Sequence, residues 1–120
     1  MTGLTERFFD AWGETDDAER GATIDEVFAK SGRYADPRSQ GMLDGPENVG
    51  RYVAMFSANA PGWTAKVIKS DEVAGVLRVT VAFGGKGPDG AEMVQHGQYF
   101  VEDDGEHITR MIGFVGTGEP

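Results

Sequence analysis

The chain has no cysteine and few basic residues, and each shortage excludes a class of protein. Without cysteine there can be no disulfide, no thiolate metal site and no thiol nucleophile, which is typical of a reducing cytoplasm. The chain has 11 Lys and Arg residues and 20 Asp and Glu residues, which gives a net charge of −9. Proteins that bind nucleic acid or anionic lipid present a basic surface. The charge therefore argues against nucleic acid and membrane as partners.

Long hydrophobic runs are missing too. No stretch approaches the roughly 18 uninterrupted apolar residues that a membrane-spanning helix needs. The first residues, MTGLTERFFDAWGE, carry acids within their apolar pattern and have no basic region ahead of an apolar segment, so we do not expect a signal peptide. We expect the protein to be cytoplasmic.

Patterns that bind metals or phosphates are scarce as well. The two histidines, His96 and His107, are separated, and the acids of ETDDAER and EDDGE lack the ligand spacing of zinc, iron or EF-hand calcium sites. The glycine-rich stretch GGKGPDG has a lysine but not the Gly-Lys-Ser/Thr ending of a phosphate-binding loop. We therefore expect no metal and no cofactor.

What the chain does have is a globular composition, with 39% hydrophobic and 10% aromatic residues over 120 positions. This length predicts one domain, residues 1–120, with a real core. The spacing of apolar residues predicts three helices in the first half. The first is expected over residues 3–14. The second starts at a cap on Asp16, with Glu19 placed as in a capping box, and runs to Gly32. The third starts at Gly45 and Pro46 and ends within residues 59–62.

The pattern between and after these helices is that of strands. In GRYADP, Tyr34 and Asp36 share one face if the backbone is extended, and Pro37 favours an extended Asp36, which predicts a short strand followed by a loop, SQGMLDG. Period-two alternation then predicts four strands, over 63–68, 76–83, 93–101 and 108–115. The fold class is α+β, with the helices on one face of an antiparallel sheet.

This order of elements is carried by three stretches, FFDAWGETD, VFAKSGRYADPRSQGMLDGPENVGRYVAMF and GQYFVEDDGEHITRMIGF. Together they resemble the SnoaL-like family of the nuclear-transport-factor-2-like (NTF2-like) superfamily, which also holds the ketosteroid isomerases. The resemblance implies a cone-shaped fold, with three N-terminal helices packed on a strongly curved antiparallel sheet. It further implies an apolar pocket and a homodimer formed through the sheet.

The resemblance also implies site residues. In the ketosteroid isomerase relatives, the acid at the position of Asp36 is a general base that faces the pocket. Those relatives hold the enolate oxygen with a tyrosine and a protonated acid, and the matching positions here are near Phe8 and Gly97, whose side chains cannot donate hydrogen bonds. One such donor contributes about 3 to 4 kcal/mol to the transition state, so steroid isomerase chemistry is not expected.

Asp36 and Tyr34 are the candidate catalytic residues, as base and as oxyanion donor. A base needs aromatic walls that desolvate it. The alternative for Asp36 is an ordinary turn, whose carboxylate accepts backbone N–H bonds or pairs with Arg33 or Arg38. The alternative for Tyr34 is a tyrosine of the core. The expected walls of the ligand pocket are Phe8, Trp12, Tyr52, Phe56, Trp63, Phe83, Tyr99 and Phe114.

Strand alternation gives two further expectations. His96 is expected to point away from Tyr99 and Gln95, toward solvent or a dimer partner, with the alternative of an acid–base role beside Asp36. His107 is expected on the surface beside a turn. On the second of the four strands the outer, interface-prone set is Val76, Arg78, Thr80 and Ala82, and the inner set is Leu77, Val79, Val81 and Phe83.

Two functions from different classes follow. The first is a protein that binds an apolar, carbonyl-bearing small molecule and catalyses proton abstraction, isomerisation or cyclisation without a cofactor. The second is a non-enzymatic ligand-binding or interaction module of the same fold, which the missing donors at Phe8 and Gly97 favour. The two differ in whether a second polar group lines the pocket within hydrogen-bond reach of Asp36.

Overall fold

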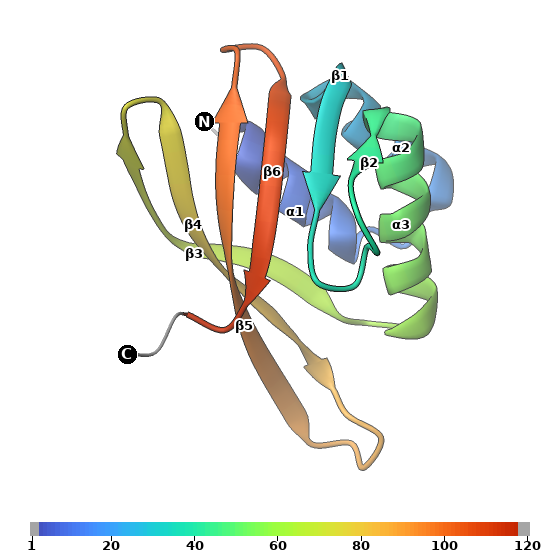
Figure 1. The fold of residues 1–120 in the computed structure, drawn as a ribbon. Coiled ribbons are helices and arrows are strands. Elements are labelled where there is room, and N and C mark those ends of the chain that lie inside the picture. Colours follow the sequence, from blue (N-terminus) through green and yellow to red (C-terminus); the bar gives the residue numbers. More distant parts are fainter. Residues whose placement is uncertain (1–2, 118–120) are drawn as a thin grey trace.

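The computed structural model describes residues 3–117, in which the helices come first and most of the sheet follows (Figure 1). The helices are α1 (Leu4–Asp10), a short 3₁₀ helix (Ala11–Gly13), α2 (Asp17–Val27) and α3 (Gly45–Asn59). The predicted cap of α2 is confirmed, because Asp16 Oδ1 accepts the Glu19 N–H at 3.0 Å. The predicted helix over 3–14 is divided instead into α1 and the 3₁₀ helix.

α2 is shorter than the sequence predicts, ending at Val27 rather than at Gly32. Phe28 continues the apolar spacing of the helix but belongs to β1 (Phe28–Ala35), where it pairs with Ile108 and is 1% exposed. Sheet pairing and burial here override the helical pattern. The expected short strand around Tyr34 is correspondingly eight residues long and starts without an intervening loop.

The strands after β1 are β2 (Leu43–Asp44), β3 (Thr64–Val73), β4 (Val76–Lys86), β5 (Glu92–Asp103) and β6 (Ile108–Val115). Over residues 3–117 they form, with β1, one six-stranded sheet in the order β2-β1-β6-β5-β4-β3. All neighbours are antiparallel except β1 and β6, which are parallel, so the predicted α+β class is confirmed. β2 lies in a stretch expected to be loop, and it forms because Arg33 and Tyr34 offer a free strand edge.

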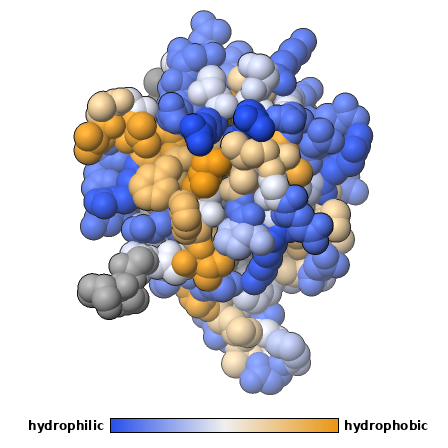
Figure 2. All heavy atoms as spheres, viewed as in Figure 1, coloured by the Kyte–Doolittle hydropathy of each residue, from blue (hydrophilic) through white to orange (hydrophobic). Residues whose placement is uncertain are grey.

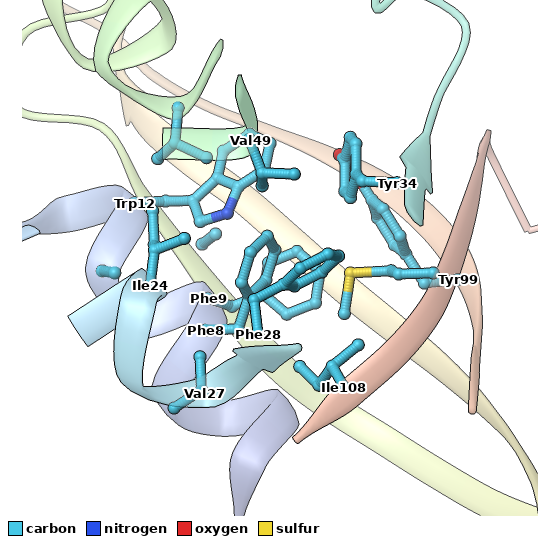
Figure 3. Packing of buried hydrophobic residues seen from close by; sticks show 14 of the residues in the cluster. Phe8, Phe9, Trp12, Ile24, Val27, Phe28, Tyr34, Val49, Tyr99 and Ile108 are labelled. Carbon is cyan, nitrogen blue, oxygen red and sulfur yellow. The ribbon is translucent and has the colours of Figure 1, made fainter. Parts of the chain in front are cut away.

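The core lies between the helices and one face of this sheet. Figure 3 shows Phe8 and Phe9 of α1 packed beside Phe28, with Tyr34 and Tyr99 next to them. On β4, Val79 and Val81 are buried and Arg78 is exposed, as the alternation predicts. The long strands β4 and β5 bend along their length (Figure 1).

A buried arginine joins the helices to one another. Arg20 of α2 is 2% exposed, and its guanidinium donates to the Glu14 carbonyl, to Asp17 Oδ1 and to Ser57 Oγ of α3. A buried charge is tolerated only when it is hydrogen-bonded in this way. Within residues 3–117, no helix has both the length and the apolar character needed to cross a membrane.

Candidate active site

A cavity of about 480 Å³ lies at the open end of the sheet, beside α3 and the 3₁₀ helix. Its polar lining includes Asp36, Arg38, Asn59 and Gln95. Hydrophobic and aromatic walls with a few convergent polar groups are typical of small-molecule sites. Among the described residues, seven aromatic side chains line it: Trp12, Tyr52, Phe56, Trp63, Phe83, Tyr99 and Phe114.

Two of the expected wall residues are placed differently from the others: Phe8 lies in the core, and Phe114 lies at the edge of the cavity. Phe8 is 0% exposed and packs among Phe9, Trp12, Phe28 and Tyr34, so it belongs to the core rather than to the lining. The lining does include Phe114. Its ring, however, is 55% exposed and packs edge-on against Phe100 at 5.9 Å. Phe114 is therefore a residue of the cavity rim.

Asp36 follows the last residue of β1 and is held by a tight turn. Its backbone N–H donates to Ser39 Oγ at 3.0 Å, and its carbonyl accepts the Ser39 N–H at 3.2 Å. Its Oδ1 accepts the Arg38 N–H at 2.8 Å. The turn expected as the alternative for Asp36 is thus present, but Arg33 pairs with Asp44 instead. The turn fixes the carboxylate without removing it from the cavity lining.

All three tyrosines of the chain meet at this carboxylate. Tyr34 Oη donates to Asp36 Oδ2 at 2.6 Å, and Tyr52 Oη lies 2.7 and 2.8 Å from Oδ1 and Oδ2. Tyr99 Oη is 3.1 Å from Tyr34 Oη. Because the one hydroxyl hydrogen of Tyr34 is directed to Asp36, Tyr99 donates to Tyr34. We call these four side chains, drawn from β1, α3, β5 and the turn after β1, the tyrosine–aspartate network.

The three phenols are held in their neutral, hydrogen-donating form. Burial raises the pKa of Tyr34 well above its ordinary value, and the neighbouring Tyr99 and Asp36 raise it further. Burial, followed by the hydrogen bond to Asp36, raises the pKa of Tyr52. Burial is also the main reason why the pKa of Tyr99 is raised. The network therefore consists of one carboxyl group and three hydroxyl donors at neutral pH.

The positions of the tyrosines change the roles expected from the sequence. Tyr34 is fully buried and absent from the cavity lining, so its hydroxyl positions Asp36 rather than facing a ligand. Tyr52 is half-buried and does line the cavity. The sequence predicted Tyr52 and Tyr99 only as apolar walls. Nothing in their spacing indicated that their hydroxyls reach Asp36 or Tyr34.

The histidines take no part in the network. His96 pairs with Ala82 and is exposed, but it also lines the cavity, so its expected orientation toward solvent or a dimer partner stays a prediction. His107 is half-buried beside the β5–β6 turn and away from the cavity lining. Within residues 3–117, no three His, Asp or Glu side chains are grouped as metal ligands.

Gly113 makes the position of Tyr99 possible. The two residues are cross-strand partners on β6 and β5, and a Cβ added at Gly113 would overlap the Tyr99 ring. A larger residue at this point must displace the ring and its hydroxyl.

Gly85 likewise leaves room for the Trp63 ring, whose carbon Cδ1 lies 2.5 Å from the Cβ position of Gly85.

Gly113→Ala should therefore destabilise the protein by about 1 to 3 kcal/mol, the usual cost of overpacking. The measurement is the free energy of unfolding in denaturant. Gly50→Ala in α3 is the matched control, because nothing lies within 4 Å of its Cβ position. It should stabilise the helix by up to about 1 kcal/mol. Equal effects of the two substitutions would contradict the role of Gly113.

No protein-family model matches the sequence, and no curated protein matches it. Solved structures do match over nearly the whole chain. A candidate isomerase of the SnoaL-like family from Agrobacterium tumefaciens has a TM-score of 0.78 at 20% identity, with 95% of each chain covered. An NTF2-like protein of unknown function from Exiguobacterium has a TM-score of 0.74 at 18% identity, covering 95% of this chain and 98% of that one. The chain has the NTF2-like fold.

Another protein with this NTF2-like fold was solved with a ligand. It comes from Catenulispora acidiphila, is described as having a ketosteroid-isomerase-like fold, and is in complex with trimethylamine. Its TM-score is 0.76 at 18% identity, with 94% of this chain and 85% of that one covered. The matches confirm the fold expected from the sequence. Fold alone does not assign a reaction, which must be argued from the site.

Proposed function

We propose that the chain binds an apolar, carbonyl-bearing small molecule in the cavity and catalyses proton transfer, as an isomerase or a cyclase, without a cofactor. Asp36 is the general base. The observation that carries the proposal is the Tyr52 hydroxyl, which lines the cavity 2.7 and 2.8 Å from the Asp36 carboxylate oxygens. A base and a hydroxyl donor on one cavity wall are the two groups that enolisation requires.

Structural relatives support this reaction class. They include the candidate SnoaL-like isomerase and a candidate SnoaL-like polyketide cyclase from Jannaschia, the latter with a TM-score of 0.76 at 16% identity. The trimethylamine complex of a third relative supports a cavity that admits small molecules. The cytoplasmic location expected from the sequence stays a prediction.

The network suggests how the two groups divide the work. Asp36 removes a proton from the carbon next to the substrate carbonyl, and the electron pair moves onto the carbonyl oxygen. Tyr52 turns its hydroxyl from Asp36 to that oxygen, which stabilises the enolate and frees a lone pair on Asp36. Tyr34, backed by Tyr99, stays on Oδ2 and holds the carboxylate in place. Returning the proton to a different carbon completes an isomerisation.

One observation favours the non-enzymatic alternative. The Asp36 carboxylate already receives hydrogen bonds from Tyr34, Tyr52 and the Arg38 N–H. A carboxylate has about four lone-pair sites, so few of them are free to accept a proton from a substrate unless Tyr52 moves. In the binding module, Tyr52 would stay on Asp36 and the ligand would only be held.

Exchange of carbon-bound hydrogen with solvent separates the two functions. The protein is incubated in D₂O with a panel of apolar ketones, and loss of the α-proton signals is followed by NMR. Acceleration of exchange above the rate with heat-denatured protein supports the proposal. Saturable binding without any acceleration would overturn the catalytic function and leave the binding module.

We also propose a homodimer that forms through the outer face of the sheet. Phe100 and Phe114 pack together there and are 38% and 55% exposed. Figure 2 shows hydrophobic residues gathered over the strands on this side of the molecule. Exposed apolar patches of this kind commonly mark interaction surfaces.

Light scattering should therefore give twice the 12.9 kDa chain mass for the wild-type protein. Phe100→Glu places a charge in the apolar pair and should yield a monomer. Ala22→Glu puts the same charge on α2 and should leave the dimer intact. A wild-type monomer at micromolar concentration would contradict the dimer.

A further inference from the structure

Arg38 stands apart from most arginines of the chain. Five of the seven pair with a carboxylate: Arg7 with Glu26, Arg20 with Asp17, Arg33 with Asp44, Arg51 with Glu47 and Arg78 with Asp71. Within residues 3–117, neither Arg38 nor Arg110 has an ion-pair partner. In a chain with 20 acidic residues, an arginine that pairs with none of the described acids is available to another anion.

Among the residues that the structure describes, Arg38 is also the one Lys or Arg that lines the cavity. Its backbone is fixed, because its N–H donates to Asp36 Oδ1 and the preceding residue is Pro37. Burial raises the pKa values of Tyr52 and Tyr99, and the positive charge of Arg38 partly offsets that rise. Arg110, by contrast, lies on β6 outside the cavity lining.

We infer that Arg38 is the anchor for an anionic group of the ligand, and that the substrates are apolar carbonyl compounds that carry a carboxylate. The inference rests on the function proposed above for the cavity. A guanidinium binds a carboxylate through two parallel N–H donors, which fixes orientation as well as position. Arg38 is exposed and Asp36 is half-buried. The carboxylate is thus held at the mouth, while the apolar body and its carbonyl reach inward to Asp36 and Tyr52.

The other charges of the protein make the expected preference for a carboxylate ligand depend on Arg38 alone. The net charge of −9 and the Asp36 carboxylate both disfavour an anion in the cavity. Among the other polar lining residues, Asn59 and Gln95 are uncharged, and His96 is an exposed imidazole. Without Arg38, the cavity should therefore prefer a neutral ligand to the matching carboxylate.

The test uses two matched probes, 6-acetyl-2-naphthoate and its neutral methyl ester, which have the same ketone and ring system. Their affinities for the full chain are measured by calorimetry, and their α-proton exchange by NMR. We expect the acid to bind at least tenfold more tightly than the ester. Arg38→Gln should weaken binding of the acid by about 10- to 100-fold, the range for hydrogen bonds to charged groups, and that of the ester by less than about threefold.

Arg110→Gln is the matched control, because it removes the same charge outside the cavity, and it should change neither affinity. Equal affinities of acid and ester for the wild-type protein, or an Arg38→Gln variant that keeps the preference for the acid, would overturn the anchor. If the ester then still binds and exchanges its α-protons, the proposed function stands without the anchor. Binding of neither probe would overturn both. A trimethylammonium analogue that binds better than the acid would show that the cavity selects cations and would also overturn the anchor.

Discussion

Asp36→Asn should lower the rate of α-proton exchange by about 10²- to 10⁴-fold for any ketone that the protein binds, the usual contribution of a general base. The amide has the size of the carboxyl group but cannot accept the proton. The affinity for the ketone should change little, because the aromatic walls provide most of the contact area. The measurement is exchange by NMR at saturating ketone, with affinity taken from calorimetry.

Two further variants make this result specific. Tyr52→Phe keeps the base and removes the donor, so it should slow exchange by about 10²- to 10³-fold. Asp44→Asn removes a carboxylate that pairs with Arg33 outside the cavity, and it should leave exchange unchanged. Unaltered exchange in Asp36→Asn, with the fold retained by circular dichroism, would show that Asp36 is not the base.

The second large effect is expected at alkaline pH. All three tyrosines have pKa values raised in the folded protein, above about 10 in an unfolded chain. The folded state thus keeps protons that the unfolded state releases. This stabilisation is fully present below a pH of about 10 and is lost as the pH rises through the folded pKa values. Between its unfolded and its folded pKa, each such tyrosine lowers the free energy of unfolding by about 1.4 kcal/mol per pH unit.

Tyrosinate absorbance tests this directly. The folded protein should show almost no phenolate signal at pH 11, whereas the protein in denaturant should titrate near pH 10. All three phenolates should then appear together as the folded structure is lost. Phenolate absorbance that rises near pH 10 while circular dichroism still reports the fold would contradict the tyrosine–aspartate network.

The fold could be predicted where local pattern and tertiary structure agree. β6 has the bounds that its alternation indicates, and Asp16 caps α2 as its spacing with Glu19 requires. The secondary structure was predicted wrongly where pairing between strands distant in sequence determines it. Phe28 fits both the stripe of α2 and a strand, and only its partner Ile108, distant in sequence, assigns it to β1. β2 has two residues and no pattern of its own.

For the site, the sequence indicated one part of the network. Tyr34 lies on β1 and Asp36 directly follows the strand two residues later, a spacing that favours the same side and agrees with their hydrogen bond. The hydroxyls of Tyr52 and Tyr99 come from α3 and β5, and their meeting depends on how these elements pack. The same is true of Gly113, which looks like any strand glycine until the Tyr99 ring is seen against it.

The cavity walls include both tryptophans of the chain, Trp12 and Trp63. Trp12 is 3% exposed, so its emission is expected to be that of a shielded indole, while the half-buried Trp63 is more open to water. Under the proposed function, a ligand in the cavity would lie against both rings and would displace water chiefly from Trp63. The intrinsic fluorescence of the protein should therefore change when the cavity is filled, without background from tryptophans elsewhere in the chain, so candidate ligands can be screened without a label.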